Sequence, residues 1–133
     1  WTPYTTNKFE TKPNGFSALT RKKRVMDNLK AFQKQAHQCA VDHGFWEVKN
    51  EHTPGNQFCL MHAELSEALE AVRNGDPQDD KIPEFTNQEA ELADVIIRVL
   101  NYSEEYGLRT IDAMLAKHKY NLSRPFKHGG KKF

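Results

Sequence analysis

Residues 53–77 decide the fold, and they read TPGNQFCLMHAELSEALEAVRNGDP. Thr53 followed by proline is typical of a helix N-cap with Pro in the first turn, whereas Asn74-Gly75-Asp76-Pro77 is a stop signal. Between these signals apolar residues recur at the helical period: Met61, Leu65, Ala68, Leu69 and Val72. The stretch therefore predicts an amphipathic helix from about Thr53 to Asn74.

The same kinds of signal predict three further helices. The first covers about 17–43 and ends at Gly44, the third covers about 86–106 behind a capping box that Thr86 opens, and the fourth runs from its cap Thr110 to about residue 123. Residues 1–16 read as an irregular arm, and the basic, glycine-containing residues 126–133 read as a non-helical tail. Because no β-period alternation appears, we predict an all-α domain over residues 17–125, a four-helix bundle.

In this bundle the apolar stripes are expected to form the core. Besides the stripe of the second helix, they comprise Val25, Leu29, Phe32, Ala36 and Cys39 in the first helix, Leu92, Val95, Ile96 and Val99 in the third, and Ile111, Met114, Leu115 and Leu122 in the fourth.

Length and composition bound the class of protein. A chain of 133 residues suggests one domain, and a net charge of +1 argues against a general polyanion binder. No run approaches 18 apolar residues and no charged-then-apolar leader opens the chain, so we expect a cytoplasmic protein without a membrane partner. Cys39 and Cys59 fall within predicted helices and are expected to be buried free thiols.

Four carboxylates stand in two short helical pairs, Glu64 with Glu67 and Glu91 with Asp94. Each pair is spaced i, i+3, so its two members project from one side of a helix, beside the apolar stripe. Twenty-three residues separate the pairs, enough for an antiparallel return. If the two helices pack antiparallel, four acidic side chains meet, and a divalent cation is what such a cluster accommodates.

The ligand types favour Mg²⁺, with Mn²⁺ as an expected substitute. Mg²⁺ takes hard oxygen donors, zinc would need His or Cys here, and a di-iron site would need Glu-x-x-His pairs. Mg²⁺ usually works together with substrate phosphates, and Lys117, Asn121 and Arg124 share the flank of the fourth helix as candidate phosphate contacts. For any single helix, charges that simply face water remain the simpler interpretation.

These elements together resemble the MazG-like all-α nucleoside triphosphate pyrophosphohydrolases. The resemblance covers about residues 25–127, and that superfamily carries an ExxE…ExxD carboxylate set followed by a KxxxNxxR element. The matching stretches are Glu64-Leu65-Ser66-Glu67, Glu91-Leu92-Ala93-Asp94 and Lys117-His118-Lys119-Tyr120-Asn121-Leu122-Ser123-Arg124. Many members begin the first motif with Glu-Glu, whereas here the leading position is Ala63, which puts the number of metal ligands or ions in doubt.

The resemblance implies a reaction and an assembly. Mg²⁺ bound by the four carboxylates would hold a nucleoside triphosphate, and a water would attack its α-phosphorus to release a nucleoside monophosphate and pyrophosphate. Glu67 is the candidate to orient or deprotonate that water. A homodimer or homotetramer is expected. The resemblance leaves open the base and sugar of the substrate, the number of metal ions, the choice between dimer and tetramer, and the biological purpose. We expect nucleotide-pool housecleaning, and the other option is the supply of precursors to a replicating virus.

Further substrate contacts carry two interpretations each. In relatives that prefer pyrimidine deoxynucleotides, a His late in the first helix and a Trp just beyond it contact the base, and His37 and Trp46 match that layout. The alternative is a surface His and a Trp that plugs the end of the bundle. Tyr102 is a candidate to close the pocket. Arg98 is a phosphate ligand or an i, i+4 ion-pair partner of Asp94. Lys127 belongs to the tail, which is interpreted either as a lid over the triphosphate or as a frayed end of the chain.

Two other functions compete with the enzyme. A catalytically silent nucleotide-binding or regulatory bundle would keep the metal site without turnover. A nucleic-acid-binding protein would use the basic run 21–24 and the basic tail, although the acidic centre would repel a polyanion unless metal were present.

Overall fold

Four helices make up the regular structure of the described residues. The computed structural model describes residues 17–47 and 52–125, and the predicted arm and tail lie outside them. The helices are α1 (Ala18–Asp42), α2 (Pro54–Arg73), α3 (Asn87–Glu105) and α4 (Thr110–Leu122). In these two ranges no strand forms beyond one isolated bridge between Gln78 and Thr86. The all-α prediction with four helices is therefore confirmed for this part of the chain.

Side-chain caps fix where the helices begin. The side chain of Thr53 accepts a hydrogen bond from the backbone N–H of Asn56, and Thr86 and Glu89 form the complete capping box that the sequence predicts. For α4 the predicted cap was wrong. Arg109 occupies the N-cap position without a side-chain hydrogen bond, because the hydroxyl of Thr110 is engaged by Ser103 at 2.7 Å.

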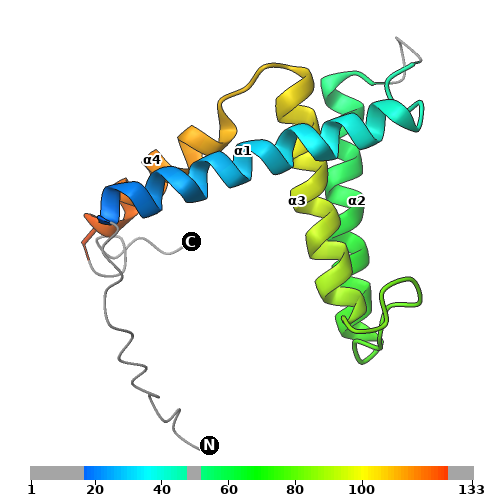
Figure 1. The fold of residues 1–133 in the computed structure, drawn as a ribbon. Coiled ribbons are helices and arrows are strands. Elements are labelled where there is room, and N and C mark those ends of the chain that lie inside the picture. The colour runs from blue at the N-terminus through cyan, green and yellow to red at the C-terminus, as the bar shows by residue number, and fades with distance from the viewer. Residues whose placement is uncertain (1–16, 48–51, 126–133) are drawn as a thin grey trace, which may run out of the picture.

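The helices form two limbs (Figure 1). α2 and α3 lie side by side and antiparallel, and the C-terminal half of α1 crosses one end of this pair (Figure 1). α4 lies along the N-terminal half of α1, away from the middle of the α2–α3 pair (Figure 1). The chain thus presents an antiparallel hairpin joined to a second limb in place of four helices around one centre.

The predicted apolar core is largely open, which corrects the expectation from the sequence. Leu69 of α2 and Ile96 of α3 are each 59% exposed. Eight further residues of the predicted core are also exposed: Val25, Phe32, Leu65, Val72, Leu92, Met114, Leu122 and Cys39. The physical reason is the arrangement: α1 covers only one end of the hairpin and α4 packs on α1, so the apolar stripes of α2 and α3 lack a facing helix among residues 17–47 and 52–125.

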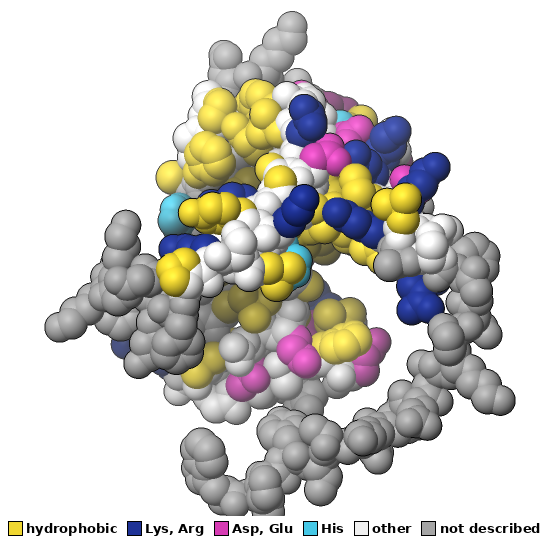
Figure 2. Space-filling model, turned by 90° about the vertical axis from the view of Figure 1, so that its left-hand side faces the viewer, with side chains coloured by type: hydrophobic (Ala, Val, Ile, Leu, Met, Phe, Trp, Pro, Cys, Tyr) yellow, Lys and Arg dark blue, Asp and Glu magenta, His cyan; other side chains and the backbone are white. Residues whose placement is uncertain are grey.

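Most of the buried residues are small or polar. Among the described residues, Ala68, Ala71, Leu100 and Ile111 are the buried apolar ones, whereas six polar residues are buried: Gln33, Gln57, Glu64, Asp79, Asn101 and Ser103. Hydrogen bonds and small side chains therefore make up much of the contact between the helices, and many of the large apolar side chains are exposed. Figure 2, which views the end where α1 begins, shows such apolar side chains at the surface among lysines and arginines.

Two smaller expectations were also tested. Cys39 and Cys59 are free thiols, as predicted, but both are exposed, because each lies on an outward face of its helix. Among the described helices, none has the length and apolar content needed to cross a membrane.

Candidate metal centre

Three of the four predicted carboxylates converge where α2 faces α3. Glu64, Glu67 and Glu91 each offer one oxygen, and these oxygens lie within 4.8 Å of one another. Glu64 is buried, Glu91 is partly buried and Glu67 is exposed. The i, i+3 spacing on α2 and the antiparallel return of α3 produce this convergence. The cluster therefore opens to solvent on the side of Glu67.

Arg98 supplies a positive charge at the buried side of the cluster. Its Nε donates a hydrogen bond to Oε1 of Glu64 at 2.5 Å. The sequence offered Asp94, four residues earlier on the same helix, as the ion-pair partner, but the closest ion pair of Arg98 crosses from α3 to α2. The guanidinium thus neutralises the most buried carboxylate of the three.

The two carboxyl groups of the cluster that lie on α3 have raised pKa values. Burial raises the pKa of Glu91 above its ordinary value of 4.5, and its hydrogen bond with Glu64 and the negative charge of Glu67 raise it further. Burial also raises the pKa of Asp94 above 3.8, as does repulsion from Glu64, while Arg98 opposes the shift. A cation placed among these groups would relieve the repulsion.

The donor set fits a magnesium ion. Magnesium–oxygen bonds of about 2.1 Å put opposite ligands about 4.2 Å apart, close to the spread of the three oxygens. All three donors are hard oxygens, and waters would complete an octahedron on the exposed side. Glu64, Glu67 and Glu91 would therefore hold the ion after small side-chain rotations.

Asp94 stands at the edge of this group. It lies one helical turn from Glu91 and its side chain is exposed, so its oxygens are not among the three that lie within 4.8 Å. Its electrostatic interaction with Glu64 nevertheless places it close to the cluster. Asp94 is thus a candidate fourth ligand that would have to turn toward the ion.

His37 and Trp46 come together, as the candidate base contacts require. His37 Nδ1 lies 2.9 Å from Oδ1 of Asn101, and Trp46 Nε1 donates to the same oxygen at 3.1 Å. The two ring centroids are 6.0 Å apart, and the ring of His52 lies 5.1 Å from that of Trp46. Residues from α1, the following turn and α3 therefore meet in one aromatic cluster.

Asn101 fixes the direction of the hydrogen bonds in this cluster. An indole N–H can only donate, so the atom of Asn101 that faces it must be the oxygen. Since that oxygen accepts, Nδ1 of His37 must carry a proton. Nε2 of His37 lies 3.5 Å from a carboxylate oxygen of Glu105.

The other predicted substrate contacts are not gathered at the carboxylates. Tyr102 packs between the rings of Phe58 and Tyr106, with centroid distances of 5.2 and 4.5 Å. The candidate phosphate contacts of the fourth helix are exposed and lie on or just after α4, on the other limb (Figure 1); they are Lys117, Asn121 and Arg124. Lys127 lies outside the described residues. Within the described part of one chain, the acidic cluster and the basic element of α4 therefore lie apart.

The basic run at the start of α1 stays on the surface. Arg21, Lys22, Lys23 and Arg24 are all exposed. Exposed charges at a helix start fit the ordinary interpretation of a solvated face.

Asn101 is the main site residue that the sequence interpretation missed. It lies seven positions after Asp94 and three after Arg98, which is the same flank of the helix continued by two turns. Extending that flank would have found it. The pairing of Arg98 with Glu64 had no such signal, because it depends on how two helices pack.

Comparisons with known proteins add no relative. The chain matches no known protein family, no curated protein and no solved structure. The residues of the site therefore carry the functional argument.

Proposed function

We propose that the protein is a Mg²⁺-dependent nucleoside triphosphate pyrophosphohydrolase of the MazG-like kind. The observation that carries the proposal is the convergence of Glu64, Glu67 and Glu91 from two helices on one point, with the pKa of Glu91 raised. Solvated acids would be expected to spread apart, since repulsion among them is unfavourable. The order of the ExxE, ExxD and KxxxNxxR elements supports the same activity.

The proposed roles follow from position. Mg²⁺ or Mn²⁺, held by Glu64, Glu67, Glu91 and Asp94, would neutralise triphosphate charge and acidify a water. Glu67, the exposed member of the cluster, takes a proton from the water that attacks the α-phosphorus. The bond from the α-phosphorus to the bridging oxygen breaks, and pyrophosphate leaves with that oxygen. His37 and Trp46, held by Asn101, contact the base.

We further propose that the active form is an oligomer, a homodimer or homotetramer. The outward apolar stripes of α2 and α3, including Leu69 and Ile96, would be covered by a second copy. Such a copy would also bring the basic element of its α4 to the carboxylates, which one chain alone keeps apart. Lys117, Asn121 and Arg124 would then act across the interface.

Product analysis tests the activity. The protein is incubated with Mg²⁺ and a panel of canonical and modified triphosphates in ¹⁸O-labelled water. Attack at the α-phosphorus puts the label in the nucleoside monophosphate and releases unlabelled pyrophosphate. Release of orthophosphate, or label in the pyrophosphate, would refute the assignment. Glu70→Gln, an exposed acid one turn beyond Glu67, serves as the matched control for Glu67→Gln.

A silent nucleotide-binding protein is the second candidate, and one observation favours it. Arg98 already neutralises Glu64, so part of the cluster is satisfied without a metal ion. This candidate predicts triphosphate binding by calorimetry with no pyrophosphate release for any member of the panel.

A further inference from the structure

The aromatic cluster uses most of its own hydrogen-bonding capacity internally. Oδ1 of Asn101, a residue that is 6% exposed, accepts from Nδ1 of His37 at 2.9 Å and from Nε1 of Trp46 at 3.1 Å. Nε1 is the single polar atom of an indole ring, so Trp46 offers a base its ring surface and no hydrogen bond. His37 keeps Nε2 alone. Recognition of a base edge by hydrogen bonds therefore depends on Nε2 of His37 and on the group beside it.

That neighbouring group is the carboxylate of Glu105. One of its oxygens lies 3.5 Å from Nε2 of His37, and residues 17–47 and 52–125 give Glu105 no other ion pair or hydrogen bond. The Glu105 side chain is 39% exposed and the His37 side chain is 19% exposed. A contact of 3.5 Å is longer than a good hydrogen bond, so both oxygens can accept from a ligand. An ionised carboxylate only accepts, and the edge of a bound base must therefore donate here.

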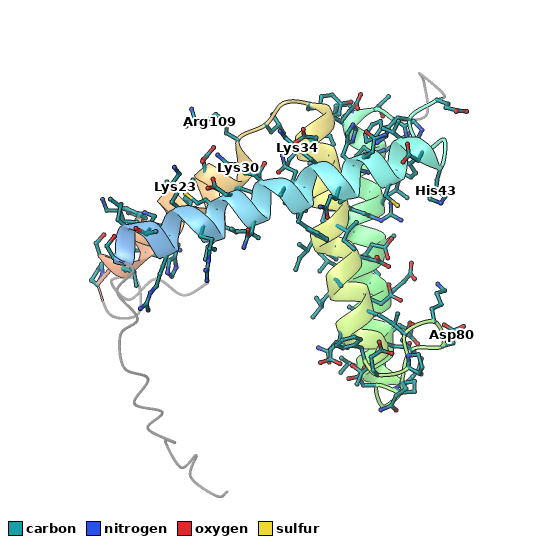
Figure 3. All side chains as sticks on the ribbon, viewed as in Figure 1. Lys23, Lys30, Lys34, His43, Asp80 and Arg109 are labelled. Carbon is teal, nitrogen blue, oxygen red and sulfur yellow. The ribbon has the colours of Figure 1, made fainter. Side chains whose placement is uncertain are left out.

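Glu105 lies on the same face of α3 as the carboxylates, nearer the other end of the helix. Asn101 and Glu105 follow Asp94 by seven and eleven positions, so both lie within about 20° of Asp94 around the helix. The rise of 1.5 Å per residue separates Asp94 from Glu105 by about 16 Å along the axis. Figure 3 shows the two ends of the α2–α3 pair, with Asp80 at one end and His43, just after α1, at the other. A nucleotide whose α-phosphate meets the metal can thus extend its base along α3 to Glu105.

The pattern of donors on the base edge distinguishes the bases. Adenine and cytosine place an amino group beside a ring nitrogen that accepts, and uracil and thymine place one N–H between two carbonyl oxygens. In these four bases an acceptor repels the second carboxylate oxygen. Guanine has two adjacent donors, N1–H and the 2-amino group, which match the two oxygens of one carboxylate. We propose that Glu105 makes the site selective for guanine nucleotides, an inference that rests on the proposed function for the placement of the base.

Titration of the full chain with nucleoside monophosphates in Mg²⁺ tests this selectivity without turnover. The readout is the indole N–H signal of Trp46 in ¹⁵N–¹H spectra, assigned from its loss in Trp46→Phe. The probes are dGMP, dAMP, dCMP and dTMP, together with dIMP, which keeps N1–H and lacks the 2-amino group. We expect dGMP to bind most tightly and dIMP to bind about tenfold more weakly, the effect of losing one charge-assisted hydrogen bond.

A variant of Glu105 and a matched control complete the test. Glu105→Gln replaces one acceptor by a donor, so it should weaken dGMP binding about tenfold and narrow the difference between dGMP and dIMP. Glu70→Gln, which changes an exposed acid of α2, should leave both affinities unchanged. The proposal is overturned if another base binds as tightly as dGMP, if dIMP binds as tightly as dGMP, or if the two variants behave alike. It is also overturned if no nucleotide moves the Trp46 signal in a protein with a dispersed spectrum.

The base selectivity and the enzymatic activity fail in different experiments. Equal rates of pyrophosphate release from dGTP, dATP, dCTP and dTTP would refute the selectivity and leave the enzyme assignment intact. Selective binding of dGMP without pyrophosphate release from dGTP would refute the enzyme assignment and support the guanine site.

Discussion

Replacing Arg98 by methionine should destabilise the metal-free protein and tighten its binding of Mg²⁺. Arg98 is 28% exposed at its side chain and Glu64 is 9% exposed, so their ion pair is largely shielded from water. Removing one partner of a fully buried pair costs about 3–5 kcal/mol, and the remaining exposure of Arg98 reduces our expectation to about 2–3 kcal/mol. Without the guanidinium, the carboxylates repel one another more strongly.

The same change removes a competitor of the metal ion. In the wild-type chain, an ion that binds Glu64 must share this carboxylate with Arg98 or displace the arginine. We therefore expect Arg98→Met to bind Mg²⁺ about tenfold more tightly, a difference of about 1.4 kcal/mol. An ion at 100 times its dissociation constant stabilises the fold by about 2.7 kcal/mol, enough to offset the loss in the variant.

Urea unfolding and calorimetry measure the two effects. Unfolding free energies are determined in EDTA and in saturating Mg²⁺, and the dissociation constant is determined by titration calorimetry. Arg73→Met is the matched control, since its contact with Glu70 is 3.7 Å long and well exposed, and it should change stability by no more than about 0.5 kcal/mol. If Arg98→Met binds Mg²⁺ no better than wild type, and loses equal stability with and without the ion, the carboxylates do not compete for a cation and the metal-site reasoning fails.

Three further predictions concern the same surfaces. Glu67→Gln should lower pyrophosphate release by about 10²–10⁴-fold with the melting temperature kept, measured by steady-state kinetics; activity near wild type would remove Glu67 as the base. The folded-state pKa values of Glu91 and Asp94 lie above 4.5 and 3.8, so these groups stabilise the fold fully at pH values below 4.5 and 3.8 and lose this contribution as pH rises through the raised pKa. Thermal unfolding in EDTA should show this loss, and Mg²⁺ should suppress it. Identical pH profiles of stability in EDTA and in Mg²⁺ would contradict the prediction. Ile96→Lys should convert the proposed oligomer to a monomer in sedimentation velocity, because it puts a charge in an apolar stripe; an unchanged sedimentation coefficient would place the interface elsewhere.

Helix boundaries were predictable because their signals are local. The capping box at Thr86 and the stop at Gly75 act within one or two turns, and Gly75 has φ = 84°, a backbone conformation in which a side chain is strained. The cap of α4 shows the limit of this reasoning. Thr110 has a suitable side chain for a cap, but its hydroxyl accepts a hydrogen bond from Ser103 of α3. No local sequence pattern predicts this contact.

Some contacts of the candidate site were likewise predictable from local spacing, and others depended on the fold. The spacing of Glu64 with Glu67 determined that these two carboxylates share a face, and the antiparallel return was enough to bring Glu91 to them. The meeting of His37 with Trp46 was a hypothesis, and the structure adds Asn101 as the group that holds both. The choice of Glu64 as the partner of Arg98 came only from the fold.

The amino-acid sequence by itself determined the four helices and which side chains lie on a common face, since both follow from the 3.6-residue period and from caps acting within a turn. Only the tertiary structure decided which faces meet. α4 packs along α1, so the basic element stands away from the acids and the apolar stripes of α2 and α3 are left outward. The physical reason is that packing between helices depends on crossing geometry and on the sum of many weak contacts, which the pattern along a single helix does not contain.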